Sequence, residues 1–210
     1  MKAYPLEAAG PVIAGVIATE VTRVGARGVV LASPPSASAD LVRRWLAPSV
    51  RVVSPDAGAV ADVAGALAAA GAPGPLVEGL AWRAVAEALG AADRLLPVGC
   101  TNKTELLLDP GPLPARVLPL GDIWASTLHA RLGDASLPRV LAHATPVEVA
   151  AVDGALVEYL ERGAPPAEAF ARLGRMEGPV REALDRAEVR RRGLLVPKLT
   201  PWSVGSDLAR

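Results

Sequence analysis

The stretch VVLASPPSASADLVRRWL, residues 29–46, joins a short apolar run to an amphipathic segment. Residues 29–32 have the composition of a buried strand, and apolar residues recur at helical spacing from Leu41 to Leu46. A strand that turns directly into a helix often holds a phosphate, because free N–H groups and the helix dipole point at the turn. Here the turn contains Pro34 and Pro35, which have no N–H to donate. The stretch therefore predicts an α/β fold with an altered anion-binding turn.

Apolar strands and helices alternate through the first 120 residues. The expected strands are short, rich in Val and Leu, and apolar without alternation, as in parallel strands that are covered on both faces. They lie at 28–32, 50–54, 95–99 and 116–119. The expected helices lie at 7–24, 38–47, 57–71 and 76–91. This alternation predicts a parallel α/β sheet.

After Pro119 the pattern becomes purely helical. Thr145 before Pro146 and Glu148 predicts a helix that begins with a capping residue, a proline at its first position and an acid at its third. Helices are expected at 121–132, 136–142, 145–162, 166–173 and 176–192, and the tail at 193–210 is expected to be extended. We therefore expect an α/β nucleotide-binding-like domain at 1–132. Residues 133–210 should form a helical segment and an extended tail that pack as part of the same domain.

Composition excludes several classes of partner. Lys and Arg number 22, as do Asp and Glu, so bulk charge favours neither nucleic acid nor an anionic membrane. The Ala-rich run around residues 58–74 is too short and too weakly apolar to span a bilayer, and residues 1–10 lack the pattern of a signal peptide. Cys100 is the single cysteine, which excludes an internal disulfide. We expect a cytoplasmic protein.

The segment LLPVGCTNKTELLL, residues 95–108, places polar side chains after a predicted buried strand. In an open parallel sheet, ligands bind outside the C-terminal ends of the strands. Glu105 could hold a cation, and Asn102 could contact a ligand. Alternatively, Thr101 or Asn102 caps the next helix and Glu105 is an ordinary acid of its first turn. The spacing alone favours the capping interpretation.

Other polar residues allow a functional and a structural interpretation. Asp122, in the segment PLGDIW at 119–124, follows a short strand and by itself is best explained as the cap of the next helix. Cys100 could be a nucleophile, although a small buried apolar residue is the commoner role. His129 has no partner nearby in the sequence. The arginines at 186 and 190–192 fit a solvated helix end, with anion binding as the alternative.

Together these segments resemble the NAD synthase family. The segments GCTNKTELLL and VLPLGDIW resemble the family patterns G-T-x-N-K-S/T-E-L and P-I-G-D-L-Y-K. The segments VDGALVEYLERGAPPAEAFARLG, EVRRR and KLTPWSVGSD are similar to the family's closing helices, its E-H/Y-K-R motif and its T-P-R-A-F-G tail. Residues 25–47 occupy the position of G-A-K-G-V-V-L-G-L-S-G-G-x-D-S, without sharing its residues at the pyrophosphate loop.

The resemblance implies a fold, an activity and an assembly. The fold is a doubly wound parallel sheet of the adenine nucleotide alpha hydrolase-like, Rossmann-like type, here with a C-terminal helical extension. The family reaction uses ATP and Mg²⁺ to adenylylate the carboxylate of nicotinic acid adenine dinucleotide, and ammonia then displaces AMP. The family forms homodimers with sites near the interface, so a homodimer is the expected assembly.

The residues that touch ATP in the family are the ones that differ here. The loop S-G-G-x-D-S corresponds to residues 33–38, where prolines replace both glycines and Ala37 replaces the magnesium-binding acid. Cys100 replaces a threonine and Ala125 replaces a lysine. The family's T-K-Y-G-D and P-S/T-A-D-L loops are missing. Losing two backbone donors, a metal-binding acid and two lysines, one at Ala125 and one in the missing T-K-Y-G-D loop, should abolish ordinary adenylylation.

The resemblance implies a set of candidate site residues. The nucleotide-site positions are Ser33, Ser36, Ser38, Cys100, Thr101, Asn102 and Asp122. Lys103, Arg190 and Arg191 are candidate contacts to a substrate or anion, and Glu105 is the candidate magnesium ligand. We expect an NAD synthase homologue that has lost ATP pyrophosphatase chemistry and acts as a nucleotide-binding, scaffold or regulatory pseudoenzyme. ATP and Mg²⁺ are implied as cofactors by the family alone. The alternatives are a still active ammonia-dependent synthase with an altered ATP loop, or a different activity in the same cleft.

Overall fold

The computed structural model describes residues 5–109, 115, 117–133 and 135–188. The chain divides into two compact units. The first comprises residues 1–101 and 111–120, and the second comprises residues 102–110 and 121–210. The domain boundary at residue 132 stays a prediction. Among the described residues, every helix is too short or too polar to cross a membrane.

The first unit contains a small parallel sheet. Its strands are β1 (Val29–Leu31), β2 (Val52–Val53) and β3 (Leu96–Val98), in the order β2-β1-β3. Val29 lies opposite Val52 on one side and Leu96 on the other. The central strand β1 is fully buried. A parallel α/β sheet is therefore confirmed, whereas the strand expected at 116–119 is reduced in the described residues to one parallel bridge between Val98 and Val117.

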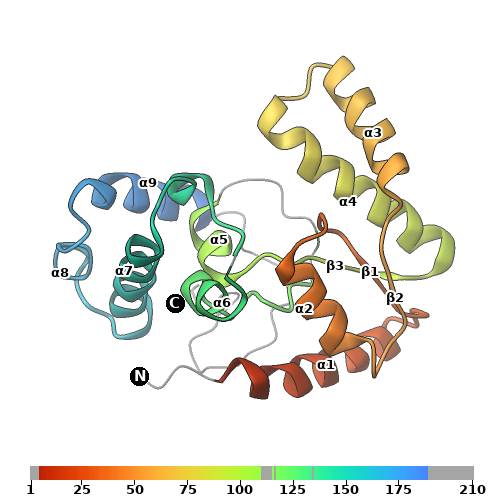
Figure 1. Ribbon diagram of the computed structural model, residues 1–210, viewed down its shortest axis with the longest axis horizontal. Helices are drawn as coiled ribbons and strands as arrows, with labels where there is room; N and C mark the ends of the chain where they lie inside the picture. Colours follow the sequence, from red (N-terminus) through yellow and green to blue (C-terminus); the bar gives the residue numbers. More distant parts are fainter. Residues whose placement is uncertain (1–4, 110–114, 116, 134, 189–210) are drawn as a thin grey trace. The chain divides into compact units, whose positions relative to one another are not determined.

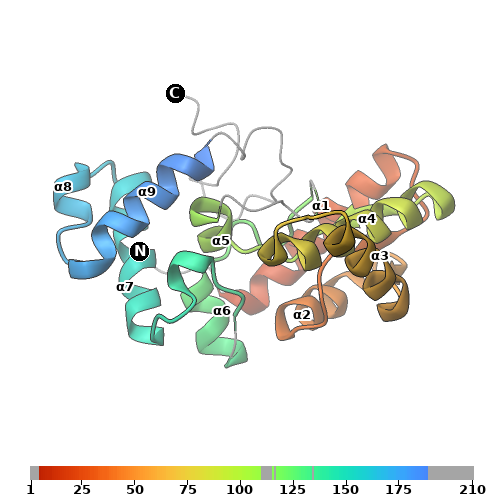
Figure 2. The same cartoon turned by 90° about the horizontal axis from the view of Figure 1, so that it is seen from above.

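Four helices pack around these strands. They are α1 (Leu6–Arg23), α2 (Ala37–Leu46), α3 (Ala57–Ala69) and α4 (Gly74–Asp93). Figure 1 shows α1 and α2 on one side of the strands and the α3–α4 hairpin on the other, and Figure 2 shows the same helices from above. Ala86 of α4 packs with Val30, Ala32 and Leu95 in a buried apolar cluster. The doubly wound arrangement of the family stays a prediction.

The second unit is helical. Its elements are α5 (Lys103–Leu108), α6 (Ala125–Leu132), the 3-10 helix η1 (Arg139–Leu141), α7 (Pro146–Leu156), the π-helical turn η2 (Val157–Glu161), α8 (Pro166–Ala169), the 3-10 helix η3 (Gly174–Met176) and α9 (Glu177–Glu188). Helix α5 packs against α9 and α6, and five of its six residues are buried. A short helix with two buried polar side chains, Lys103 and Thr104, therefore lies in the interior of this unit.

Several predicted helix boundaries in the second unit are wrong. The helix expected at 121–132 begins at Ala125, because residues 121–123 form a turn. The helix expected at 145–162 ends at Leu156, and a π-helical turn follows in which Arg162 N–H donates to the Val157 carbonyl. The segment at 136–142 forms only the short η1 after Pro138, and the one at 166–173 is helical only as far as Ala169. Residues 189–192 and the tail lie outside the described residues.

Candidate functional site

The turn between β1 and α2 uses its side chains on the protein's own backbone. Ser36 is the N-cap of α2, and its Oγ accepts a hydrogen bond from the N–H of Ala39 at 3.1 Å. Ser33 Oγ accepts a hydrogen bond from the N–H of Cys100 at 2.9 Å. Ser38 is buried. With prolines at 34 and 35, the turn offers few groups of its own to an anion.

Ser33 and Cys100 meet where two neighbouring strands end. Ser33 follows β1 and Cys100 follows β3, and the two strands are paired in parallel. The sulfur-bearing side chain of Cys100 is buried in this packing, and the neighbouring Gly99 N–H donates to the Val117 carbonyl. The placement of these polar positions at the C-terminal edge of the sheet is therefore confirmed, as expected for an open parallel sheet.

Asn102 and Glu105 form a capping box at the start of α5. Asn102 Oδ1 accepts from the N–H of Glu105 at 3.0 Å, and Glu105 Oε2 accepts from the N–H of Asn102 at 3.0 Å. Asn102 Nδ2 donates to Glu105 Oε2 and to the Ser136 carbonyl, both at 2.8 Å, and Ser136 Oγ donates to Glu105 Oε1. The capping interpretation is confirmed. Both carboxylate oxygens of Glu105 are engaged in this cap.

Burial changes the acid–base behaviour of Glu105. Burial raises the pKa of the Glu105 carboxyl group to about 7, and the hydrogen bonds from Ser136 and Asn102 only partly oppose that rise. Asp109 raises the same pKa further by charge repulsion. Near neutral pH the carboxyl group is therefore present in both protonation states. The magnesium role of Glu105 stays a prediction, and the described residues contain no cluster of three or more metal-ligating side chains.

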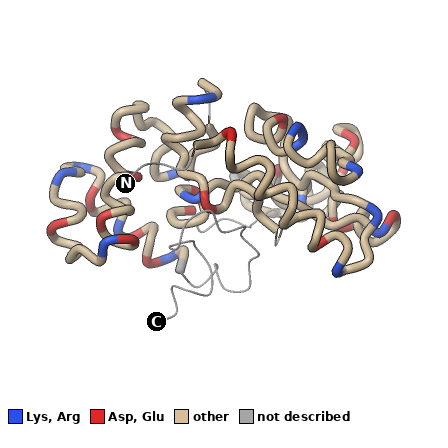
Figure 3. The backbone as a smooth tube through the Cα atoms, turned by 90° about the horizontal axis from the view of Figure 1, so that it is seen from below, with Lys and Arg blue, Asp and Glu red and all other residues tan. Residues whose placement is uncertain are grey.

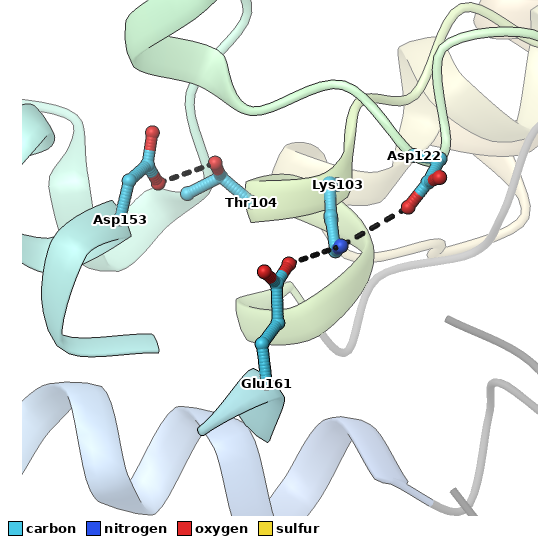
Figure 4. A network of polar contacts seen from close by, with 5 residues as sticks. All are labelled: Lys103, Thr104, Asp122, Asp153 and Glu161. Carbon is cyan, nitrogen blue, oxygen red and sulfur yellow. Dashed lines mark hydrogen bonds and ion pairs between the residues drawn. The ribbon is translucent and has the colours of Figure 1, made fainter. Parts of the chain in front are cut away.

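Lys103 is buried between two carboxylates, as Figure 4 shows. Its Nζ lies 3.0 Å from Asp122 Oδ1 and 2.9 Å from Glu161 Oε1. The same nitrogen lies 4.6 Å from the centroid of the Trp124 ring, in a cation–π arrangement. Only 1% of Lys103 is exposed, so these groups replace the water that an ammonium group normally binds. The arrangement joins α5, the 121–123 turn and η2.

Asp122 does not cap the next helix. The N-cap of α6 is Trp124, which makes no side-chain capping bond, whereas Asp122 binds Lys103. The prediction that Asp122 is a helix cap is therefore wrong. Among the described side chains, the Oε2 atom of Glu161 is buried without a hydrogen-bond partner. Sequence reasoning missed Glu161, because the only signal was indirect: a lysine in an apolar helix requires an acidic partner.

A second buried network supplies the missing cap of α6. Thr104 Oγ1 donates to Asp153 Oδ1 at 2.6 Å and accepts from the N–H of Ala125 at 2.9 Å. Asp153 Oδ2 accepts from the N–H of Ser126 at 2.8 Å. Burial raises the pKa of Asp153, and the hydrogen bonds from Thr104 and Ser126 and the charge of Lys103 oppose that rise. Ala125 is thus fully buried, with its N–H bound to Thr104.

The remaining candidate residues are His129 and the arginines at and after the end of α9. His129 lies half-buried in the last turn of α6. Arg186 is exposed and lies 3.5 Å from Glu182, as in a solvated helix end. Arg190 and Arg191 lie outside the described residues.

The candidate nucleotide-site positions belong to both units. The first unit contains Ser33, Ser36, Ser38, Cys100 and Thr101, and the second contains Asn102 and Asp122 together with Lys103 and Glu105. Within the first unit, Ser33 and Cys100 are in direct contact. Within the second unit, two pairs are in contact, Asn102 with Glu105 and Lys103 with Asp122.

Comparison with known proteins finds a distant structural likeness. No protein-family model matches the chain, and no curated protein matches it either. The chain is similar to a solved structure of glutamine-dependent NAD+ synthetase from Acinetobacter baumannii in complex with adenosine diphosphate, at 17% sequence identity and a TM-score of 0.45. The alignment covers 91% of this chain and 47% of that one, so the chain spans about half the length of that protein.

Proposed function

We propose that the chain is an NAD-synthase-like protein that does not adenylylate a substrate and acts as a scaffold. The order of the motifs along the sequence supports the relationship. The observation that supports the loss of chemistry is the β1–α2 turn, where Pro34 and Pro35 lack N–H donors and the Ser36 hydroxyl caps its own helix. The β1–α2 turn therefore keeps its strand and its helix but offers few hydrogen-bond donors to a pyrophosphate group.

The expected loss of rate is large. Removing one preorganised donor to a developing charge typically costs about 2.7–4 kcal/mol, or a factor of 10² to 10³ in rate. Here two donors are absent, and Ala37 has no oxygen with which to bind Mg²⁺. Ala125 offers no charge in place of a lysine. Even with non-additive effects, the remaining rate should be below that of a working synthase by many orders of magnitude.

The direct test is an assay for NAD formation. The full chain is incubated with nicotinic acid adenine dinucleotide, ATP, Mg²⁺ and ammonium, and the NAD formed is measured. We expect no turnover. Turnover that is lost in both Glu105→Ala and Glu105→Gln, the second of which preserves the cap, would contradict the proposal and favour an active synthase with an altered loop.

Restoring the loop should not restore activity. The combined change Pro34→Gly, Pro35→Gly and Ala37→Asp supplies the missing donors and acid, but Cys100 and Ala125 still differ from the family. We expect the triple variant to remain inactive in the same assay. NAD formation by this variant would show that the loop alone accounts for the loss.

Ligand titration separates the scaffold from a nucleotide-binding protein. A ligand at 100 times its dissociation constant stabilises a protein by about 2.7 kcal/mol, which is visible as a rise in Tm. Because Ser33 and Ser36 are already hydrogen-bonded within the protein, we expect no rise with ATP, AMP or NAD at millimolar concentration. A scaffold should also assemble, and light scattering on the full chain should give the mass of a homodimer.

A further inference from the structure

Three arginines precede the three strands of the first unit. Arg27 comes before β1, Arg51 before β2 and Arg94 before β3. Parallel strands begin at the same edge of a sheet, and backbone bonds join these starting points. The N–H of Arg27 donates to the Arg94 carbonyl at 2.7 Å, and the N–H of Val29 donates to the Arg51 carbonyl at 2.8 Å. The strand pairing therefore brings the backbones of the three arginines to one edge of the sheet.

A fourth arginine lies close by in the chain. Arg23 ends α1 four residues before Arg27. We call the four residues Arg23, Arg27, Arg51 and Arg94 the basic edge. All four are exposed. Figure 3 shows blue segments, with red segments among them, at the right-hand end of the tube, where α1 and α4 end in Figure 1.

Two guanidinium groups of the basic edge are not engaged by the part of the chain that the structure describes. Arg23 pairs with Glu20, and Arg94 Nη2 donates to the Gly25 carbonyl at 2.8 Å. Arg27 and Arg51 make no side-chain hydrogen bond or ion pair with any described residue. Arg23 and Arg94 lie at helix ends, where a cation balances the helix dipole. Arg27 and Arg51 lie in no helix, so an interaction with a helix dipole does not account for their positive charges.

We propose that the basic edge is a docking surface for an acidic segment of a partner protein. Neighbouring strands lie about 4.8 Å apart, so the three strand starts span about 10 Å. Alternate side chains of an extended segment lie about 6.6 Å apart, which lets two carboxylates reach this row. A guanidinium group binds a carboxylate through two parallel hydrogen bonds, so Arg27 and Arg51 can each hold one acid.

The surroundings of the basic edge favour a protein partner over nucleic acid. Val24 lies between Arg23 and Arg27 in the chain and is 44% exposed, which offers an apolar contact that a side chain can use. The chain has no net charge, so it lacks the long-range field that draws proteins to polyphosphate chains. The basic edge also lies at the opposite end of the strands from the β1–α2 turn, and the inference is therefore independent of the proposed scaffold role.

The test uses a fluorescein-labelled peptide of alternating Glu and Val. Its anisotropy is followed as the full chain is added at low salt, and the titration is repeated with rising NaCl. We expect saturable binding that weakens as salt screens the charges. Arg27→Glu with Arg51→Glu should reduce the affinity by at least about tenfold. Arg172→Glu with Arg181→Glu, at two exposed arginines of the second unit, changes the net charge by the same amount; it is the matched control and should retain binding.

Several results would overturn the inference. They are absence of peptide binding at low salt, an equal loss in Arg172→Glu with Arg181→Glu, or tighter binding of an oligothymidylate of the same charge. Circular dichroism checks that each variant is folded. If the double Glu variant does not fold, Arg27→Ala with Arg51→Ala provides the same comparison. Arg27→Lys with Arg51→Lys should keep only part of the affinity, because lysine lacks the paired donors.

Discussion

Nζ of Lys103 lies 2.9 Å from Oε1 of Glu161, although 58 positions separate the two residues in the chain. Asp122 approaches the same nitrogen to 3.0 Å. Burying an ammonium group is costly unless charged partners replace its water. The position of Lys103 therefore depends on these two carboxylates, and they depend on it. This mutual dependence holds α5, the 121–123 turn and η2 in one arrangement.

Replacing Lys103 should strongly destabilise the protein. Lys103→Met removes the charge while keeping much of the volume, and it leaves Asp122 and Glu161 without their shared partner. Breaking a buried ion pair on one side typically costs about 3–5 kcal/mol. We expect a loss of that order in the free energy of unfolding, measured by urea denaturation.

The control is the double variant Lys103→Met with Glu161→Leu. It removes one stranded carboxylate along with the lysine, so part of the stability should return. A double variant that is no more stable than Lys103→Met alone would show that the unpaired charge of Glu161 does not contribute to the destabilisation.

Local sequence signals predicted much of the fold. The apolar runs of β1 and β3 and the amphipathic pattern of α2 marked their elements to within two residues. The cap at Thr145 was also predictable, because Ser/Thr, Pro and Glu at this spacing satisfy the free N–H groups of a helix start. The start of α6 was not predictable, since its N–H groups bind Thr104 and Asp153 rather than a neighbouring residue.

Only part of the candidate site could be predicted, because some of its contacts join neighbours in the sequence and others join distant residues. The cap between Asn102 and Glu105 spans three residues and can be found from spacing. The partners of α5 come from far along the chain: Asp153 lies 49 positions from Thr104. Charged residues on helices usually face solvent, so nothing local distinguished Glu161 from the exposed Glu158 pairing with Arg162.

Thr104→Val should destabilise the start of α6. Valine has the same shape but can neither accept from the N–H of Ala125 nor donate to Asp153. A buried group left without its partner costs about 1–3 kcal/mol, and here two groups lose a partner. We expect a loss of about 2–4 kcal/mol by urea denaturation. Thr104→Ser keeps the hydroxyl group and should lose less; equal losses in the two variants would mean that packing, not hydrogen bonding, is responsible.

Stability should depend on pH through Glu105. Its pKa rises from 4.5 to about 7 on folding, so the folded state binds a proton more tightly than the unfolded state does. The stability contributed by this carboxyl group is fully present below about pH 4.5 and is lost as the pH rises through about 7. Each pKa unit corresponds to about 1.4 kcal/mol, which gives a change of roughly 3 kcal/mol.

Glu105→Gln isolates this effect. Glutamine can still complete the capping box but does not titrate. Urea denaturation from pH 4 to pH 8 should show the variant gaining stability relative to the native protein as the pH rises. The contribution of Asp153 is common to both proteins and cancels in the difference. A constant difference across this range would contradict a raised pKa for Glu105.

Gly28→Ala should be among the most damaging changes in the first unit. Gly28 has a φ of 154°, which side-chain-bearing residues rarely adopt, and an added Cβ would lie 2.4 Å from the Arg51 carbonyl oxygen. That carbonyl accepts from Val29, so it cannot move without breaking the β1–β2 pairing. We expect a loss of about 3 kcal/mol or more in the free energy of unfolding. The matched control is Gly15→Ala in α1, where an added Cβ meets nothing within 4 Å and should stabilise the helix by about 0.5–1 kcal/mol. Similar unfolding midpoints for the two variants would contradict this prediction. They would show that β1 and β2 can shift enough to accept the added Cβ atom next to the Arg51 carbonyl oxygen.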